Sequence, residues 1–282
     1  MEKDIKKYFV IFALPTLIAF TIAFLVPFGM GVYLSFTEFT TISNAKWVGF
    51  SNYVKAFEDG SNFLGALLFT SKFAIIAVIT INVFSFAIAL ALTKGLKGTN
   101  LFRTVFFMPN LIGGIVLGYI WQLIINGFLI NVFGVDITFD ANYGFWGLII
   151  LTNWQLVGYM MIIYIAGIQN IPDELIEAAK IDGATSFQVL FNITIPLVMP
   201  SITICSFLTL TNAFKMFDQN LALTAGAPAD QTTMLALDIY KTFYGRVGYE
   251  GVGQAKAVMF FVMIAILAFI QLYLTRSKEV EN

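Results

Sequence analysis

Six long runs without a charged side chain are the feature that most constrains this sequence. A membrane core about 30 Å thick is crossed by roughly 20 apolar residues of α-helix, and each run is long enough to contain such a helix. A strand of a membrane barrel would instead alternate apolar and polar residues over about ten positions. We therefore predict six transmembrane helices, within residues 8–36, 73–93, 104–135, 141–172, 183–214 and 257–275.

Composition places the whole chain in the same class. Its residues are 59% hydrophobic and only 12% charged, with a mean hydropathy of +0.83, which is outside the range of soluble proteins. The first run resembles a signal peptide because lysines precede it, but its 29 uncharged residues exceed an apolar signal core. We expect an all-α integral membrane protein with one transmembrane domain over residues 1–282, in which a first helix at 8–36 precedes a five-helix core at 66–275.

Lysine and arginine in the short segments predict the orientation of the chain. If six spans alternate, eight Lys and Arg of the short segments fall on one side, whereas the outer segments 37–65 and 215–256 carry charges of both signs. Cytoplasmic loops carry the excess of Lys and Arg. Both chain termini are then cytoplasmic. The net charge of −1 offers no basic face, so we expect no nucleic-acid partner. The residues that set this orientation are Lys3, Lys6, Lys7, Lys94, Lys97, Arg103, Arg276 and Lys278.

Several kinds of chemistry are excluded by what the sequence lacks. It has no histidine, a single cysteine, Cys205, and no GxxxxGK[ST] loop. A metal site, a catalytic triad and a P-loop nucleotide site are therefore not expected, and neither is a cofactor bound by this chain. No Asp or Glu lies within the six runs, so the carboxyl groups from which a proton relay is built are missing. Sodium coupling through carbonyl and hydroxyl groups stays open.

A charged, glycine-containing stretch, EAAKIDGATSFQVLFNITIP at residues 177–196, separates the fourth and fifth runs. Pro172 suits the first position of a helix, acidic residues follow it, and Gly183 suits a left-handed stop. We predict a short helix from about 172 to 181. It is too short to cross a membrane.

A second short helix is expected to follow. Thr185 or Ser186 caps it, it runs through Phe191, and Pro196 bends the entry into the fifth span. Apolar residues give each helix one hydrophobic face. Two interpretations fit: an ordinary amphipathic cytoplasmic loop, or a docking element for a soluble partner.

The same stretch resembles the EAA motif of permease subunits from binding-protein-dependent ABC importers. Ile195 stands where that motif usually has leucine before the proline. Other segments resemble the sugar-uptake branch of the family over nearly the whole chain, although Ala227 replaces a usual glycine. The matching motif residues are Glu177, Ala178, Ala179, Asp182, Gly183, Ala184, Phe187, Ile193 and Pro196. The supporting segments are Ala13-Leu14-Pro15, Arg103 with Phe106-Phe107-Met108-Pro109, Trp121, Ile171-Pro172 and Leu223-Thr224-Ala225-Gly226-Ala227-Pro228.

The resemblance implies a permease fold with a cytoplasmic coupling-helix loop at residues 170–191, here called the EAA loop. It implies a second permease subunit, two ATPase subunits that carry ATP and Mg, and an extracytoplasmic solute-binding protein, in a bacterial-type cytoplasmic membrane. This chain would translocate a sugar and hydrolyse nothing. Glu177 would contact the ATPase, Ala178 and Ala179 would allow close packing, and Gly183 would form the turn. Asp182 and Pro196 complete the predicted coupling residues.

Polar residues within the spans are candidates for contacts with the solute. Thr152, Gln155 and Tyr159 are three and four residues apart, so they share one face of the fourth helix. Asn110 in the third run, and Thr209 with Asn212 in the fifth, complete the predicted site. Because the runs hold no charge, a neutral polyhydroxylated solute is favoured. The alternative is that these side chains join helices to one another, which Asn, Gln and Thr commonly do in membranes.

Two further functions stay open from the sequence. The same machinery would carry another solute, such as glycerol phosphate, if Lys72 or Lys215 supplied a cation; Lys72 is otherwise expected to reach toward the outer interface. Alternatively, the chain is a self-sufficient ion-coupled transporter or channel. The sequence does not decide whether segment 215–256 forms a surface helix, a plug or a contact with a binding protein.

Overall fold

The computed structural model describes residues 9, 12–58 and 60–276 of the 282. Within them nearly all regular structure is helical, and strands are limited to one antiparallel pair, β1 (Thr37–Glu38) and β2 (Lys46–Trp47). Lys3, Lys6, Lys7 and Lys278, which contribute to the predicted orientation, lie outside the described residues. Contacts group the chain into two compact units, Met1–Phe63 with Ile239–Phe261 and Leu64–Asp238 with Val262–Asn282. The expectation of one domain stays a prediction.

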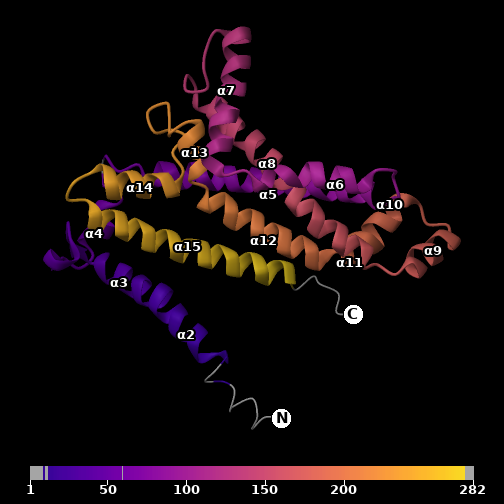
Figure 1. The fold of residues 1–282 in the computed structure, drawn as a ribbon, viewed down its shortest axis with the longest axis horizontal. Coiled ribbons are helices and arrows are strands. Elements are labelled where there is room, and N and C mark those ends of the chain that lie inside the picture. Colours follow the sequence, from indigo (N-terminus) through magenta and orange to yellow (C-terminus); the bar gives the residue numbers. More distant parts are fainter. Residues whose placement is uncertain (1–8, 10–11, 59, 277–282) are drawn as a thin grey trace. The chain divides into compact units, whose positions relative to one another are not determined.

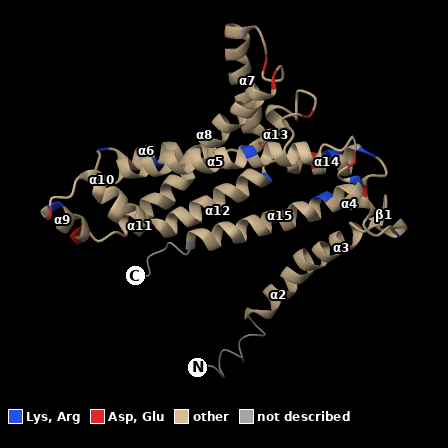
Figure 2. Cartoon of the chain, turned by 180° about the vertical axis from the view of Figure 1, so that it is seen from behind, with Lys and Arg blue, Asp and Glu red and all other residues tan. Residues whose placement is uncertain are grey.

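The first unit begins with the predicted first span. This is one helical stretch, Leu14–Leu34, made of α2 (Leu14–Phe20), a π-helical segment η1 (Thr21–Leu25) and α3 (Val26–Leu34). The wider π turn ends two residues before Pro27, whose ring blocks the normal hydrogen-bond ladder and which has no N–H. The stretch carries no charge, as its uninterrupted tan colour in Figure 2 shows. Proline therefore changes the local winding without ending the helix.

A buried asparagine holds the rest of the first unit together. Asn52, on α4 (Ser51–Lys55), donates from Nδ2 to the carbonyl oxygens of Ser35 and Thr37 at 3.0 and 2.8 Å. Gly251, near the start of α15 (Glu250–Arg276), packs against the same place, because a Cβ atom there would lie 2.3 Å from the oxygen of Thr37. A 3₁₀ turn η2 (Ile42–Asn44) connects the two strands. The end of α14 (Leu235–Gly245) also belongs to this unit.

The second unit contains most of the predicted spans. In chain order, its helices are α5 (Phe63–Leu92, apart from its first residue), α6 (Thr99–Phe107), the 3₁₀ turn η3 (Met108–Leu111), α7 (Gly114–Phe133), α8 (Ala141–Gln169), α9 (Asp173–Ile181), α10 (Ser186–Val189), the π segment η4 (Leu190–Thr194), α11 (Ile195–Leu197), α12 (Met199–Lys215), α13 (Asp218–Leu223), the start of α14 (235–238) and the second half of α15 (262–276). Figure 1 shows α9 and α10 together at one end of this unit.

The predicted fold class, an all-α membrane protein, is confirmed. Among the described residues five helices are long and apolar enough to cross a membrane, and a sixth span results if Ser186–Leu197 and Met199–Lys215, bent by 68°, count as one. The span predicted within run 104–135 is present as Gly114–Phe133, although the run as a whole is not one continuous helix. The run divides into α6 and α7 at η3, because Pro109 breaks the ladder and Gly113 and Gly114 follow.

Two helices begin earlier than predicted, each because a lysine lies inside the helix. α5 starts at Phe63 rather than 73, and the Lys72 ammonium lies 4.5 Å from the centroid of the Phe145 ring. α15 starts at Glu250 rather than 257, and the buried Lys256 donates from Nζ to Thr242 Oγ1 at 2.9 Å. Both cations have partners that sequence reasoning did not supply. In both cases the helix begins before the uncharged run does.

Helix α8 is the centre of the second unit. It contacts α6, α7, α12 and α13, and 61% of its most apolar 18-residue window is buried, against 28% or less in the other four long spans. The closest approach is at Gly158, where an added Cβ atom would lie 1.8 Å from the backbone oxygen of Phe106 on α6. Only a residue without a side chain permits this backbone contact.

We expect Gly158→Ala to destabilise the protein in detergent by about 1–3 kcal/mol, because the new methyl group forces α6 away from α8. The measurement is the thermal unfolding midpoint of the purified chain. Gly127→Ala on α7 is the matched control, since its Cβ would meet nothing within 4 Å. Equal midpoints for the two variants would contradict the close packing of α6 on α8.

Candidate functional site

The second unit contains a partly open cavity of about 600 Å³ whose wall comes from five segments. Most of the polar side chains that line the cavity are uncharged: four carry amides and one carries a phenol. The lining residues are Asn110 of η3, Gln155, Leu156 and Tyr159 of α8, Leu208, Asn212 and Lys215 of α12, Met216 and Phe217 of the connection, and Asp218 and Gln219 of α13. The volume lies in the range of small-ligand sites. We call it the solute cavity.

Four of the six predicted solute residues, Asn110, Gln155, Tyr159 and Asn212, meet in this cavity. Thr152 and Thr209 lie outside the lining. Both are buried, and each hydroxyl donates to the carbonyl four residues earlier, Thr152 to Leu148 and Thr209 to Cys205, at 2.7 Å. Threonine in a membrane helix commonly makes this local bond, which leaves its hydroxyl without a donor for a ligand.

Gln155 is held by hydrogen bonds on both sides of its amide. Its Oε1 accepts from Gln219 Nε2 at 2.8 Å, and its own Nε2 donates to the carbonyl oxygen of Ile112 at 3.4 Å. The side chain is 7% exposed. Gln155 therefore connects α8 to α13 and to the break between α6 and α7, and it fixes the orientation of Gln219 at the cavity wall.

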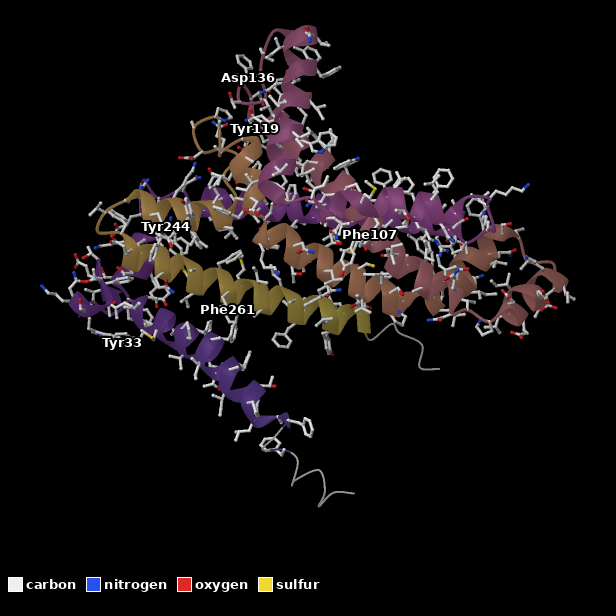
Figure 3. All side chains as sticks on the ribbon, in the orientation of Figure 1. Tyr33, Phe107, Tyr119, Asp136, Tyr244 and Phe261 are labelled. Carbon is white, nitrogen blue, oxygen red and sulfur yellow. The ribbon has the colours of Figure 1, made fainter. Side chains whose placement is uncertain are left out.

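Tyr159 brings an aromatic ring to the cavity. It lies next to Gly158, and its ring centroid is 6.4 Å from that of Phe107 at the end of α6. Phe107 is labelled in Figure 3. A half-buried tyrosine presents both a ring face and a hydroxyl group, which suits a ligand with apolar and hydroxylated surfaces.

Sequence reasoning did not place Asp218 and Gln219 in the site, and it considered Lys215 only as a cation for another solute. All three line the cavity. The signal was the polar sequence immediately after the fifth run, in which Lys215 and Asp218 are three residues apart and both are exposed. With one positive and one negative side chain, the lining has no net charge.

The beginning of segment 215–256 is an ordered support for the cavity. Asn220, fully buried on α13, donates from Nδ2 to the Thr232 oxygen at 2.8 Å and accepts at Oδ1 from Met234 N at 2.9 Å. Thr232 donates its hydroxyl to the Ala227 carbonyl at 2.7 Å. Three side-chain bonds thus close the loop after α13, and α14 follows it as a helix.

The EAA loop forms the two short helices expected. α9 ends as predicted, with Gly183 left-handed at φ +82°, but Pro172 precedes the helix as its cap residue instead of occupying its first position. Thr185, rather than Ser186, caps α10: Thr185 Oγ1 accepts from Gln188 N at 3.4 Å, and Thr185 N donates to Gln188 Oε1 at 2.7 Å. This is a capping box.

The second short helix does not end at Phe191. It continues through the π segment η4 and α11 to Leu197, and the 68° bend follows Leu197, one residue beyond Pro196. The π turn just before Pro196 absorbs the missing N–H and the ring, so the proline is passed and the bend comes later. The π segment η1 likewise precedes Pro27, and the helix continues past that proline as α3.

The predicted coupling residues lie on an accessible surface of the second unit. Glu177, Ala178, Asp182 and Gly183 are exposed, whereas Ala179 and Pro196 are half-buried. Large apolar side chains accompany them: Ile181 is 85% and Phe187 75% exposed. An apolar surface of this kind, next to charged residues, is typical of a docking site.

Comparison with known proteins identifies the family. Residues 84–280 match the family described as "Binding-protein-dependent transport system inner membrane component". The chain belongs to this family of ABC importer permeases. The matched region contains the solute cavity and the EAA loop, and the permease is a multi-pass membrane protein.

Similar permeases and structures agree with this assignment. The chain is 44% identical over 282 residues to the probable starch degradation products transport system permease protein AmyD of Thermoanaerobacterium thermosulfurigenes, covering 96% of this chain and 94% of that protein. It is 31% identical to the multiple sugar-binding transport system permease protein MsmF of Streptococcus mutans, covering 99% of each. A crystal structure of a bacterial alginate ABC importer has the same fold, with a TM-score of 0.81, 21% identity and 98% coverage of each chain.

The bond between Gln155 and Gln219 is testable by a double-mutant cycle in the permease. Leucine substitutions at the two positions, alone and together, should give an interaction free energy of about 0.6 kcal/mol in unfolding, typical of side-chain bonds between membrane helices. Gln155 with Asn212 is the control pair, since both line the cavity without a bond between them. Equal coupling in both pairs would remove the link between α8 and α13.

Proposed function

We propose that this chain is the translocation subunit of an ATP-driven importer that carries a sugar or oligosaccharide across a bacterial-type cytoplasmic membrane. An extracytoplasmic binding protein delivers the solute, a second permease subunit completes the pathway, and two ATPase subunits drive alternating access. Both termini of the chain are cytoplasmic. Nucleotide and Mg bind to the ATPase subunits, and this chain catalyses no reaction.

The observation that carries the proposal is the chemistry of the solute cavity. Amides of Asn110, Asn212 and Gln219 can both donate and accept, as sugar hydroxyls require, and Tyr159 offers a ring face. The net charge of the lining is zero. The starch-product and multiple-sugar permeases named above, which resemble this chain over nearly its full length, support a carbohydrate solute.

An anionic solute is the second candidate, because Lys215 lines the cavity. The alginate importer with the same fold is described as importing an acidic polysaccharide. In this chain Asp218 lies in the same wall and offsets the cation. A neutral sugar is therefore favoured, and a sugar acid or sugar phosphate would depend on Lys215.

Coupling is proposed to run through the EAA loop. Glu177 and the exposed faces of α9 and α10 contact the ATPase, Ala178 and Ala179 allow close approach, and Gly183 sets the angle between the two helices. Asp182 ends α9 beside that turn. One helical path then leads from Ser186 through the bend near Pro196 to Asn212 and Lys215, so a push on α10 is transmitted to the cavity wall.

For the solute role, we expect Tyr159→Ala and Asn212→Ala each to lower sugar-stimulated ATPase activity about two- to tenfold, the worth of a lost hydrogen bond. The assay uses the reconstituted permease complex with its binding protein. Thr209→Val is the control, because that hydroxyl is used inside its own helix. Uptake by the purified chain alone, driven by an ion gradient without an ATPase, would overturn the importer.

For the coupling role, Gly183→Leu should abolish copurification of the ATPase while membrane insertion is preserved, because a left-handed turn with a side chain costs about 1–2 kcal/mol and redirects α10. Gly134→Leu is the matched control: Gly134 has φ +72° and equally free surroundings, but it lies in another loop. We expect Glu177→Lys to have the effect of Gly183→Leu. ATPase binding by both coupling variants would count against docking there.

A further inference from the structure

A second cavity, of about 390 Å³, lies where the end of α5 meets the helices of the EAA loop. It shares no lining residue with the solute cavity. Helix α5, the connection after it, α9, α10 and η4 all contribute. The lining residues are Leu90, Lys94, Lys180, Ala184, Ser186, Phe187, Val189, Leu190 and Thr194. We call it the lysine cavity.

The polar part of the lysine cavity is cationic and unneutralised. Lys94 and Lys180 come from different segments, and no Asp or Glu belongs to the lining. Within the part of the chain that the structure describes, neither lysine side chain has a hydrogen bond or ion pair. Two ammonium groups in one lining without a carboxylate favour an anion.

A nearly buried hydroxyl points to the same kind of ligand. Thr194 is 6% exposed, lines the cavity, and its hydroxyl makes no hydrogen bond among the described residues. Other buried threonines of the unit, such as Thr203 and Thr209, donate to the carbonyl four residues earlier. Thr194 lies in a π segment, where that geometry is changed. Its free donor suits an oxygen of the ligand.

The rest of the wall is apolar, which limits the ligand further. Leu90, Phe187, Val189 and Leu190 surround the cations. A small hydrated anion would use the lysines and leave this wall in contact with water. An amphiphile uses both parts. Lys94 directly follows the uncharged run 73–93, and the end of such a run lies at the level of the lipid headgroups.

We propose that the lysine cavity binds the headgroup of an anionic phospholipid. The phosphate lies between Lys94 and Lys180, the hydroxyls of Thr194 and Ser186 donate to its oxygens, and the first carbons of the acyl chains contact Leu90 and Leu190. The lipid then joins the end of a membrane-spanning helix to the EAA loop. The position of α9 and α10 would depend on the lipid composition of the membrane.

The test measures lipid retained by the full chain. The chain is equilibrated in phosphatidylcholine nanodiscs with and without a minority of phosphatidylglycerol, and bound phosphatidylglycerol is counted by native mass spectrometry. Each lysine near an anionic surface contributes a factor of about five, so Lys94→Gln with Lys180→Gln should weaken retention about 25-fold. Thr194→Val, which removes the hydroxyl and keeps the branched shape of the side chain, should weaken it severalfold.

The control is Lys97→Gln, which removes an exposed lysine of the same connection that does not line the cavity. Retention should then stay at the level of the unchanged chain. Equal losses for Lys97→Gln and the double variant would mean a diffuse surface effect and would overturn the site.

Two further arms identify the ligand. Inorganic phosphate should not displace the lipid; displacement would show that a free anion is the ligand. If the double variant retains lipid normally but no longer copurifies with the ATPase, the cavity receives a partner's acidic side chain, and the lipid proposal is wrong. Loss of lipid with normal ATPase copurification supports the proposal and leaves the coupling role of Glu177 and Gly183 unaffected.

Discussion

Inside a bilayer no water is available to hydrogen-bond a backbone N–H or C=O group, so each such group needs a partner within the protein. The structure of this chain follows from that constraint. Its spans are helices that satisfy their own backbones, and the hydroxyls of Thr152 and Thr209 donate to carbonyls of their own helices. Non-helical backbone is tolerated at depth only where protein covers it or it lines a cavity. The break between α6 and α7 agrees: Asn110 of η3 lines the solute cavity, and the free carbonyl of Ile112 accepts from Gln155.

The residues proposed for solute binding and those proposed for coupling lie toward opposite ends of one continuous stretch of chain. The solute cavity lies at one end of α12, and the helices of the EAA loop continue from its other end through the bend after Leu197. The π segment before Pro196 keeps the path helical where a proline would otherwise interrupt it. A rigid displacement at α10 therefore has a continuous covalent route to Asn212.

Features encoded by neighbouring residues could be predicted from the sequence. The spans follow from uncharged runs, α9 from its acidic start, and the turn after it from Gly183, whose φ is +82°. Features that depend on distant residues could not be predicted. Lys72 and Lys256 can lie within helices because each has a partner distant in the sequence: the Lys72 ammonium contacts the Phe145 ring, and the Lys256 ammonium donates to the Thr242 hydroxyl. Gln219 reaches the cavity because the loop after α13 is closed around Asn220. Helical periodicity correctly places Thr152 on the same face as Gln155. However, the Thr152 side chain is buried within the protein and does not line the cavity. The roles of the site residues in transport stay predictions.

The contact between Gly158 and the backbone of Phe106 has a consequence for how solute range evolves in such a permease. The neighbouring residues, Tyr159 and Phe107, meet ring to ring, and Tyr159 forms part of the cavity. The close approach of the two main chains at Gly158 therefore helps to set where the Tyr159 ring lies in the cavity wall. A substitution at Gly158, which does not itself line the cavity, would move that ring and change the shape of the cavity, so selection on solute size could act through a residue outside the lining.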